Sequence, residues 1–384
     1  MDFAETREQI LLRETVRRIA SGFGEAYFRE KARSGGKTTE LWDALAAEGF
    51  LGACLPEEYG GGGLGITELA IVCEETAAAG CPLLLLVVTP SISGTIIARF
   101  GTEEQKRRWL PGLASGREKI VFALTEPDAG SNTHNLSTVA ERDGDGYRLR
   151  GTKHYITGVD EAGAMLVVAR TGTDERTGRG LLSLFVVPTE APGLERQPID
   201  VALVTPERQF TLFFDDVAVP AENLIGEEDN GLPQLFFGLN PERITGAAFA
   251  VGAGLLALEK ACRYANEREV WGVPIGAHQG LAHPLAKCKI ELELAKLMTY
   301  KAAWLYDEGY DAGGATNMAN YAAAEASLAC IDEAIQVHGG PGLSEEIGLT
   351  DMWWGARLGR TAPVSREMIL NYIAQASLGL PRSY

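Results

Sequence analysis

The chain has 384 residues, of which 46% are hydrophobic and 23% charged, and its formal net charge is −17. This length allows two or three domains, and the composition is that of a soluble globular enzyme. The acidic excess argues against binding to nucleic acid or to an anionic membrane surface, because both need a basic patch. We therefore expect neither nucleic acid nor a membrane as a partner.

The six cysteines are scattered, and none has metal-ligand spacing from another cysteine or from a histidine. They are Cys54, Cys73, Cys81, Cys262, Cys288 and Cys330. We interpret them as buried, reduced thiols of a cytoplasmic protein and expect no metal site. Residues 1–10 are polar, unlike a signal peptide, and the longest apolar run, 82–88, is too short to span a bilayer.

Three zones follow one another along the chain. Up to about residue 115 the apolar residues have helical spacing, with glycine-rich breaks at 34–36 and 60–65. From residue 120, short runs rich in Val, Leu and Phe alternate with turn-prone clusters such as 143–146, which predicts successive antiparallel strands. From residue 232 the pattern is helical again.

These zones predict an α+β protein of three parts. The parts are an N-terminal all-helical domain (1–119), a central antiparallel β domain (120–231) and a C-terminal four-helix bundle (232–384). Long helices are expected at 241–269, 279–308 and 317–337. On the second of these helices, Leu285, Ile290, Leu294, Leu297 and Trp304 are expected to face inward.

Gly60, Gly62 and Gly65 match the spacing of the dinucleotide-binding fingerprint. That fingerprint requires a strand directly before the glycines and an acidic residue about 20 positions later. Here residues 56–59 intervene and position 85 is leucine. The three glycines therefore indicate a turn between helices, and a Rossmann dehydrogenase is disfavoured.

Residues 123–132 open the β zone with small and hydroxylated side chains, which allow close approach and hydrogen bonding to a polar ligand. Further motifs occur at 56–61, 151–157 and 214–226. In sequence, order and spacing these motifs resemble those of the acyl-CoA dehydrogenase family, except that Asn132 stands where Asp is usual. The resemblance continues to the C-terminal region and covers nearly the whole chain.

The resemblance implies FAD as cofactor, an acyl-CoA or other acyl thioester as substrate, and an electron-transfer flavoprotein as electron acceptor. It places the FAD against the β domain, with the ring beside Tyr155 and its N5 atom facing the Thr157 hydroxyl. The residues implied to bind FAD from the β domain are Phe122, Leu124, Thr125, Gly130, Ser131, Tyr155 and Thr157. Arg268, Trp271, Gln279, Gln336, Gly339 and Gly340 are implied to reach the FAD of a neighbouring subunit, and Ser365 is assigned to the FAD site as well. A shared FAD implies a dimer or tetramer.

The family chemistry needs a carboxylate base beside the α carbon of the thioester. The usual glutamate position is Pro363 here, and proline also lacks the backbone N–H that would bind the thioester oxygen. Glu242 matches the position from which a minority of the family supplies the base, so it is our candidate catalytic residue. Two alternatives stay open: Glu242 could merely complement the dipole of a helix starting at Pro241, or Glu367 could be the base.

Ser131 and Arg243 are the residues implied to contact the substrate. Two further functions stay open, the second because the usual glutamate and its backbone N–H are both lost. The same fold and flavin could serve a monooxygenase, or the chain could be a catalytically silent subunit of a hetero-oligomer.

Overall fold

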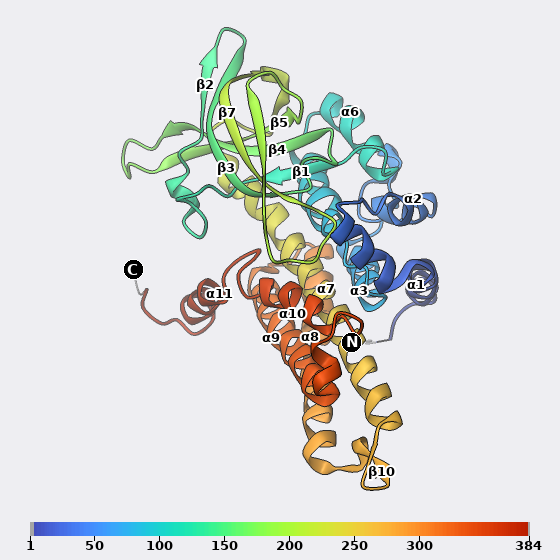
Figure 1. Cartoon of the computed structure of the whole chain (residues 1–384). Coiled ribbons are helices and arrows are strands. Elements are labelled where there is room, and N and C mark those ends of the chain that lie inside the picture. Colours follow the sequence, from blue (N-terminus) through green and yellow to red (C-terminus); the bar gives the residue numbers. More distant parts are fainter. Residues whose placement is uncertain (1–3, 383–384) are drawn as a thin grey trace.

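The computed structural model describes residues 4–382, so residues 1–3 of the expected polar N-terminus lie outside it. Figure 1 shows the β-sheet at one end of the long helix α7, with the N-terminal helices along its side and a helical arm towards its other end. The N-terminal helices are α1 (Arg7–Ser34), α2 (Thr39–Ala47), α3 (Ile66–Ala78), α4 (Leu84–Leu86), the π-helical segment η3 (Val87–Gly94), α5 (Thr95–Phe100) and α6 (Glu103–Ala114).

Capping residues and glycines set the limits of these first helices. Helix α1 begins with a capping box, in which Gln9 N–H donates to Thr6 Oγ1 and Thr6 N–H donates to Gln9 Oε1. The glycines at 60–65 form a turn before α3, and no strand precedes them. A Cβ at Gly61 would collide with the carbonyl of Leu55, so the chain needs glycine there for close packing. The expected interhelical turn is confirmed.

The central part is an eight-stranded sheet in the order β6-β7-β3-β2-β4-β5-β8, with β1 paired to β4. Its strands are β1 (Ile120–Ala123), β2 (Val139–Asp143), β3 (Gly146–Thr157), β4 (Ala164–Thr173), β5 (Gly180–Pro188), β6 (Leu194–Ile199), β7 (Gln209–Pro220) and β8 (Leu224–Ile225). The 143–146 hairpin joins β2 to β3 as expected. However, β1 and β2 both pair with β4 in parallel, so a purely antiparallel sheet is wrong at these two contacts. Long connections rather than hairpins link these strands, which permits parallel pairing.

The C-terminal part consists of long helices joined at a small hairpin. Its elements are α7 (Gly231–Glu267), β9 (Glu269–Val270), β10 (Val273–Pro274), α8 (Gln279–Asp307), α9 (Gly313–His338), α10 (Leu349–Leu358) and α11 (Arg366–Tyr372). The predicted class, with N-terminal helices, a central sheet and C-terminal helices, is confirmed. The three-part division at 119/120 and 231/232 stays a prediction about independent domains.

Helix α7 begins ten residues earlier than expected, and Pro241 lies in its interior. Pro233, in the first turn, is the proline that fits a helix start, because its missing N–H has no carbonyl to bind there. The missing N–H of Pro241 instead frees the carbonyl of Phe237, which accepts the Tyr306 hydroxyl at 3.4 Å.

Among residues 4–382, α7 is the one helix long and apolar enough to cross a membrane by length and composition, but most of its apolar stretch is buried. It packs against α3, α8 and α9. A Cβ at Gly252 would collide with the carbonyl of Glu74 on α3, so the glycine lets the two backbones approach. Helix α7 is therefore the core helix of this protein.

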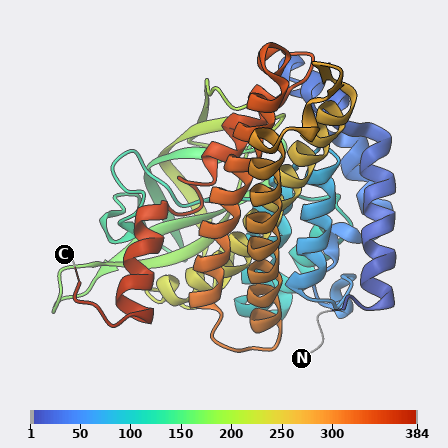
Figure 2. The same ribbon diagram turned by 90° about the horizontal axis from the view of Figure 1, so that it is seen from below.

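The expected inward face of α8 is largely wrong. Figure 2 shows α8 and α9 running side by side along one face of the molecule. Leu285 is buried, but Ile290, Leu294, Leu297 and Trp304 are 61%, 61%, 52% and 51% exposed. A second apolar or small face, Cys288, Leu292, Ala295, Thr299 and Ala302, is turned to the core instead. Helical spacing alone cannot choose between two apolar faces.

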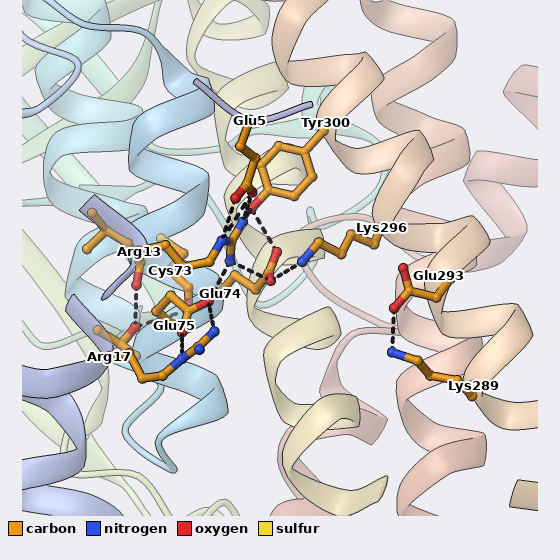
Figure 3. A network of polar contacts seen from close by, with 12 residues as sticks. Glu5, Arg13, Arg17, Cys73, Glu74, Glu75, Lys289, Glu293, Lys296 and Tyr300 are labelled. Atoms are coloured by element: carbon orange, nitrogen blue, oxygen red, sulfur yellow. Dashed lines mark hydrogen bonds and ion pairs between the residues drawn. The ribbon is translucent and has the colours of Figure 1, made fainter. Parts of the chain in front are cut away.

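A buried charge network joins α1, α3 and α8 (Figure 3). Arg13 donates to Glu74 at 2.8 Å and also to Glu75, and both glutamates are almost fully buried. Lys296 and the Tyr300 hydroxyl donate to Glu74 from α8. Burial would lower the pKa of Arg13, but its carboxylate partners raise it, so the guanidinium stays charged. The network therefore fastens α1 to the core helices.

All six cysteines are free thiols. Cys73, Cys81, Cys288 and Cys330 are buried, whereas Cys54 is partly buried and Cys262 is exposed. The expectation of six buried thiols is therefore wrong for Cys54 and Cys262. Cys262 lies on the exposed face of the last turns of α7, whose opposite face still buries Ala261 and Ala265.

Candidate active site

A buried ion pair fixes the loop after β1 to strand β3. Lys153 Nζ lies 2.8 Å from both Glu126 Oε1 and the carbonyl oxygen of Leu124. The other oxygen of Glu126 accepts the backbone N–H and the hydroxyl of Ser137, so both ends of the loop are held. Burial raises the pKa of Glu126, but Lys153 and the donors at Ser137 and Thr138 outweigh it and bring the pKa to about 2. The carboxylate is therefore charged at neutral pH.

This anchor brings Thr125 beside β3, where the N–H of His154 donates to the Thr125 carbonyl at 2.8 Å. Tyr155 follows with φ 57°, a left-handed conformation that is rare for a bulky residue. Its exposed ring meets the ring of His154 edge-on, with centroids 4.4 Å apart. Phe122, Leu124, Thr125, Tyr155 and Thr157 are all at least partly accessible, and we call these five residues the sheet-edge cluster.

Thr157, the last residue of β3, pairs across the strands with Gln209, the first residue of β7. The Thr157 hydroxyl donates to Gln209 Oε1 at 3.0 Å. Gly130 and Ser131 follow the turn closed by Glu126 N–H donating to the Ala129 carbonyl, and both are exposed. No atom lies within 4 Å of a Cβ built on Gly130, so a ligand can approach that backbone closely.

Glu242 lies in the interior of α7, well past its first turn. One turn later on the helix, the hydroxyl of Thr245 is hydrogen-bonded to that of Ser91 in η3 at 3.1 Å. Ser93, also in η3, reaches the carbonyl of Val121 in β1 at 3.5 Å. Segment η3 therefore joins the helix around Glu242 to the strand that leads into the sheet-edge cluster.

The two candidate bases, Glu242 and Glu367, differ in the pKa of the carboxyl group and in its partners. Burial raises the pKa of Glu242 to about 7, and the Arg243 guanidinium offsets this only in part. No residue in the described part of the chain hydrogen-bonds the Glu242 carboxylate, so its oxygens are free for a ligand. Glu367 is exposed and paired with Arg366 at 2.7 Å, which lowers the pKa of Glu367. The interpretation of Glu242 as a first-turn residue of its helix is wrong, because α7 starts at Gly231.

Arg243 is buried beside Glu242 and donates from Nη1 to the carbonyl of Leu239 at 3.0 Å. Its Nε has no hydrogen-bond partner within the described residues. Burial lowers the pKa of Arg243, while Glu242 and Tyr372 of α11 oppose this. Ser365 caps α11 by accepting the N–H of Met368 and is only partly exposed.

The residues predicted to reach the FAD of a neighbouring subunit, which we call the Arg268 group, lie at the other end of α7. Arg268, Trp271, Gln279, Gln336, Gly339 and Gly340 are all exposed there. Tyr264 stacks on His338 with ring centroids 4.4 Å apart, so the ends of α7 and α9 meet. Trp271 and Gly272 both have positive φ, which closes the tight β9–β10 hairpin and leaves Trp271 88% exposed.

Glu242 and Arg268 are separated by 26 residues, roughly 40 Å along a helix that rises about 1.5 Å per residue. One chain therefore does not bring the two groups together. A ligand that touches both needs a second chain to supply one of them.

Three sequence profiles match the chain in order. They are the N-terminal, middle and C-terminal domains of acyl-CoA dehydrogenase, at residues 6–117, 121–217 and 229–378. The fold and the site thus define a flavoenzyme-type architecture of helices, sheet and helices, and the chain belongs to the acyl-CoA dehydrogenase family. The resemblance found in the sequence motifs is confirmed.

Relatives agree over the full length. The chain is 57% identical over 384 residues to acyl-CoA dehydrogenase FadE12 of Mycobacterium tuberculosis, covering 100% of this chain and 99% of that protein. The structure of butyryl-CoA dehydrogenase from Megasphaera elsdenii matches with a TM-score of 0.93 and 30% identity, over 98% of this chain and 100% of that one. An FAD complex of PigA matches with a TM-score of 0.93 and 28% identity, over 99% of this chain and 100% of that one.

Sequence reasoning assigned no role to Lys153, Glu126 or Gln209. Lys153 stands between Thr152 and His154, so no apolar pattern marks it as the buried ammonium that needs a carboxylate. Gln209 is not marked by any local pattern either, because its partner depends on the register between β3 and β7.

Proposed function

We propose that this protein uses FAD to oxidise an acyl-CoA to its α,β-unsaturated thioester, with Glu242 as the base. The observation that carries the proposal is the free Glu242 carboxyl, whose pKa burial raises to about 7, on the helix tied to the sheet-edge cluster. A base with a pKa near the working pH combines a useful deprotonated fraction with proton affinity.

The residues present fit FAD. The sheet-edge cluster offers the hydroxyls of Thr125 and Thr157 and the exposed ring of Tyr155 to a flavin, and the open backbone at Gly130 allows close approach. Arg268 of a second copy suits a diphosphate, because a guanidinium is always charged and offers forked donors. When bound, FAD supplies the acceptor for the hydride that leaves the β carbon.

Each protein group then has a defined task. Glu242 takes and holds the proton from the α carbon. Arg243 and Ser131 position the thioester; one guanidinium nitrogen of Arg243, Nη1, is held by the carbonyl of Leu239, which fixes the side chain beside Glu242. We propose that an electron-transfer flavoprotein then receives the electrons, as the family implies, and that the protein works in the cytoplasm.

Self-association completes the proposed site. Ile290, Leu294, Leu297 and Trp304 recur at three- to seven-residue steps and expose an apolar stripe along α8. We propose that a second copy covers this α8 stripe and brings its Arg268 group to the sheet-edge cluster. In a symmetric dimer the same contact then completes both sites.

The test compares Glu242→Gln with Glu367→Gln by anaerobic mixing with saturated acyl-CoA substrates. Glu242→Gln should retain FAD but slow flavin bleaching by about 10²- to 10⁴-fold, the usual worth of a positioned base. Glu367→Gln should bleach at the wild-type rate. The wild-type rate should rise as the pH rises through about 7, because Glu242 must be deprotonated. A slow Glu367→Gln beside a fast Glu242→Gln would reverse the assignment.

A further inference from the structure

The single proton of the Thr157 hydroxyl is committed within the protein. It points to Gln209 Oε1 at 3.0 Å, and Gln209 is only 6% exposed. The two residues are directly paired across β3 and β7, and the N–H of Gly158 donates to the carbonyl of Arg208 at 2.8 Å just beyond them. Backbone pairing therefore places the two side chains opposite one another, and because a carboxamide oxygen can only accept, the Thr157 hydroxyl is the donor.

A hydroxyl has one proton to donate and two lone pairs that accept. With its proton on Gln209, the Thr157 oxygen offers only lone pairs to a ligand. Thr157 is partly exposed, so a ligand can reach that side of the oxygen. Thr157 is thereby prepared to accept a hydrogen bond and not to donate one.

We propose that Gln209 is a positioning residue that makes Thr157 an obligate hydrogen-bond acceptor toward flavin N5 and so favours the reduced flavin. The inference rests on the proposed function, in which Thr157 faces N5. Oxidised N5 carries no hydrogen and can only accept a hydrogen bond, whereas reduced N5 carries one and donates it. An acceptor-only Thr157 therefore matches the reduced state alone.

The readout is the reduction potential of the FAD-loaded protein, measured in equilibrium with a reference dye. Gln209→Met frees the Thr157 proton to bind oxidised N5, so the ratio of reduced to oxidised flavin should fall about fivefold to tenfold at a fixed dye potential. A tenfold fall corresponds to about 30 mV for a two-electron couple. Gln209→Asn, whose shorter side chain withdraws the acceptor oxygen, should give a fall in the same direction.

Two further variants separate positioning from general damage. In a Thr157→Val background, Gln209→Met should no longer shift the potential, because the hydroxyl that it orients is gone. Thr171→Val removes a comparable cross-strand hydroxyl contact, to Ser183 at 2.7 Å between β4 and β5, and should leave the potential unchanged.

The outcomes distinguish the inference from the proposed function. A wild-type protein that binds no FAD overturns the proposed function, and the inference with it. A protein that binds FAD but whose potential is unchanged, or rises, in both Gln209 variants overturns the inference alone. A shift that persists in the Thr157→Val background would also overturn it.

Discussion

The buried Lys153–Glu126 pair should be the strongest single anchor of the candidate site. Lys153→Met keeps the length and apolar stem of the side chain but removes its charge. Glu126 is then left almost fully buried without an opposite charge, held only by the donors at Ser137 and Thr138, and the carbonyl of Leu124 loses its donor. Breaking a buried pair in this way typically costs about 3–5 kcal/mol.

Urea unfolding in the same excess of FAD, followed by circular dichroism, measures that loss. Arg150→Met is the matched control, because Arg150 lies on the same strand and its ion pairs with Glu141 and Asp216 are exposed. Exposed pairs contribute at most about 1 kcal/mol each, so the control should stay close to the wild type. A Lys153→Met protein no less stable than the Arg150→Met protein would refute the anchoring role.

The pH dependence gives a second check of the same pair. In the wild type, the pKa of Glu126 is lowered from 4.5 to about 2, so its stabilisation is present above pH 4.5 and is lost as the pH falls through 2. Without Lys153, the pKa of Glu126 should rise, because burial is then opposed only by the donors at Ser137 and Thr138, and the carboxylate should take up its proton at a higher pH than in the wild type. The deficit of Lys153→Met should therefore shrink as the pH is lowered from 7 into the acid range, and a constant deficit would contradict this account.

Three other predictions concern the stability of the fold and the assembly of the oligomer. Arg13→Met should lower the free energy of unfolding by about 3–5 kcal/mol, because it breaks the buried network of Figure 3, whereas the same change at the more exposed Arg17 should cost less. Burial raises the pKa of Glu207 from 4.5 to about 7, so the cost of its charge appears as the pH rises above 4.5. In unfolding experiments, Glu207→Gln should be more stable than the wild type by up to about 3 kcal/mol at pH 9 and equal to it at pH 4. Leu294→Asp should dissociate the oligomer in analytical ultracentrifugation, and an unchanged assembly would remove the α8 stripe from the interface.

Local patterns were sufficient where the structure depends on neighbours in sequence. The hairpin at 143–146 and the turn at 60–65 follow from residues that tolerate positive φ or close approach. The long C-terminal helices were also predictable from their spacing. The start of α7 was misplaced because both Pro233 and Pro241 are compatible with a helix start, and only the structure shows which one lies in the first turn.

Features that depend on contacts between residues far apart in the sequence could not be predicted from local patterns. The parallel pairing of β1 with β4 and the outward face of α8 are set by packing, not by periodicity. Family motifs supplied the FAD-site residues, and the structure adds what fixes them: Lys153 holds the loop, and Gln209 holds Thr157. Neither contact can be predicted without knowing the register of β3.

The most direct test of the central claim is an anaerobic titration of the purified, FAD-saturated protein with a series of saturated acyl-CoA esters, followed by the absorption of the oxidised flavin. The account predicts a yellow protein that retains FAD after gel filtration and that at least one ester bleaches, with release of the α,β-unsaturated thioester. A protein that retains no FAD, or that keeps its oxidised spectrum with every ester, would contradict it.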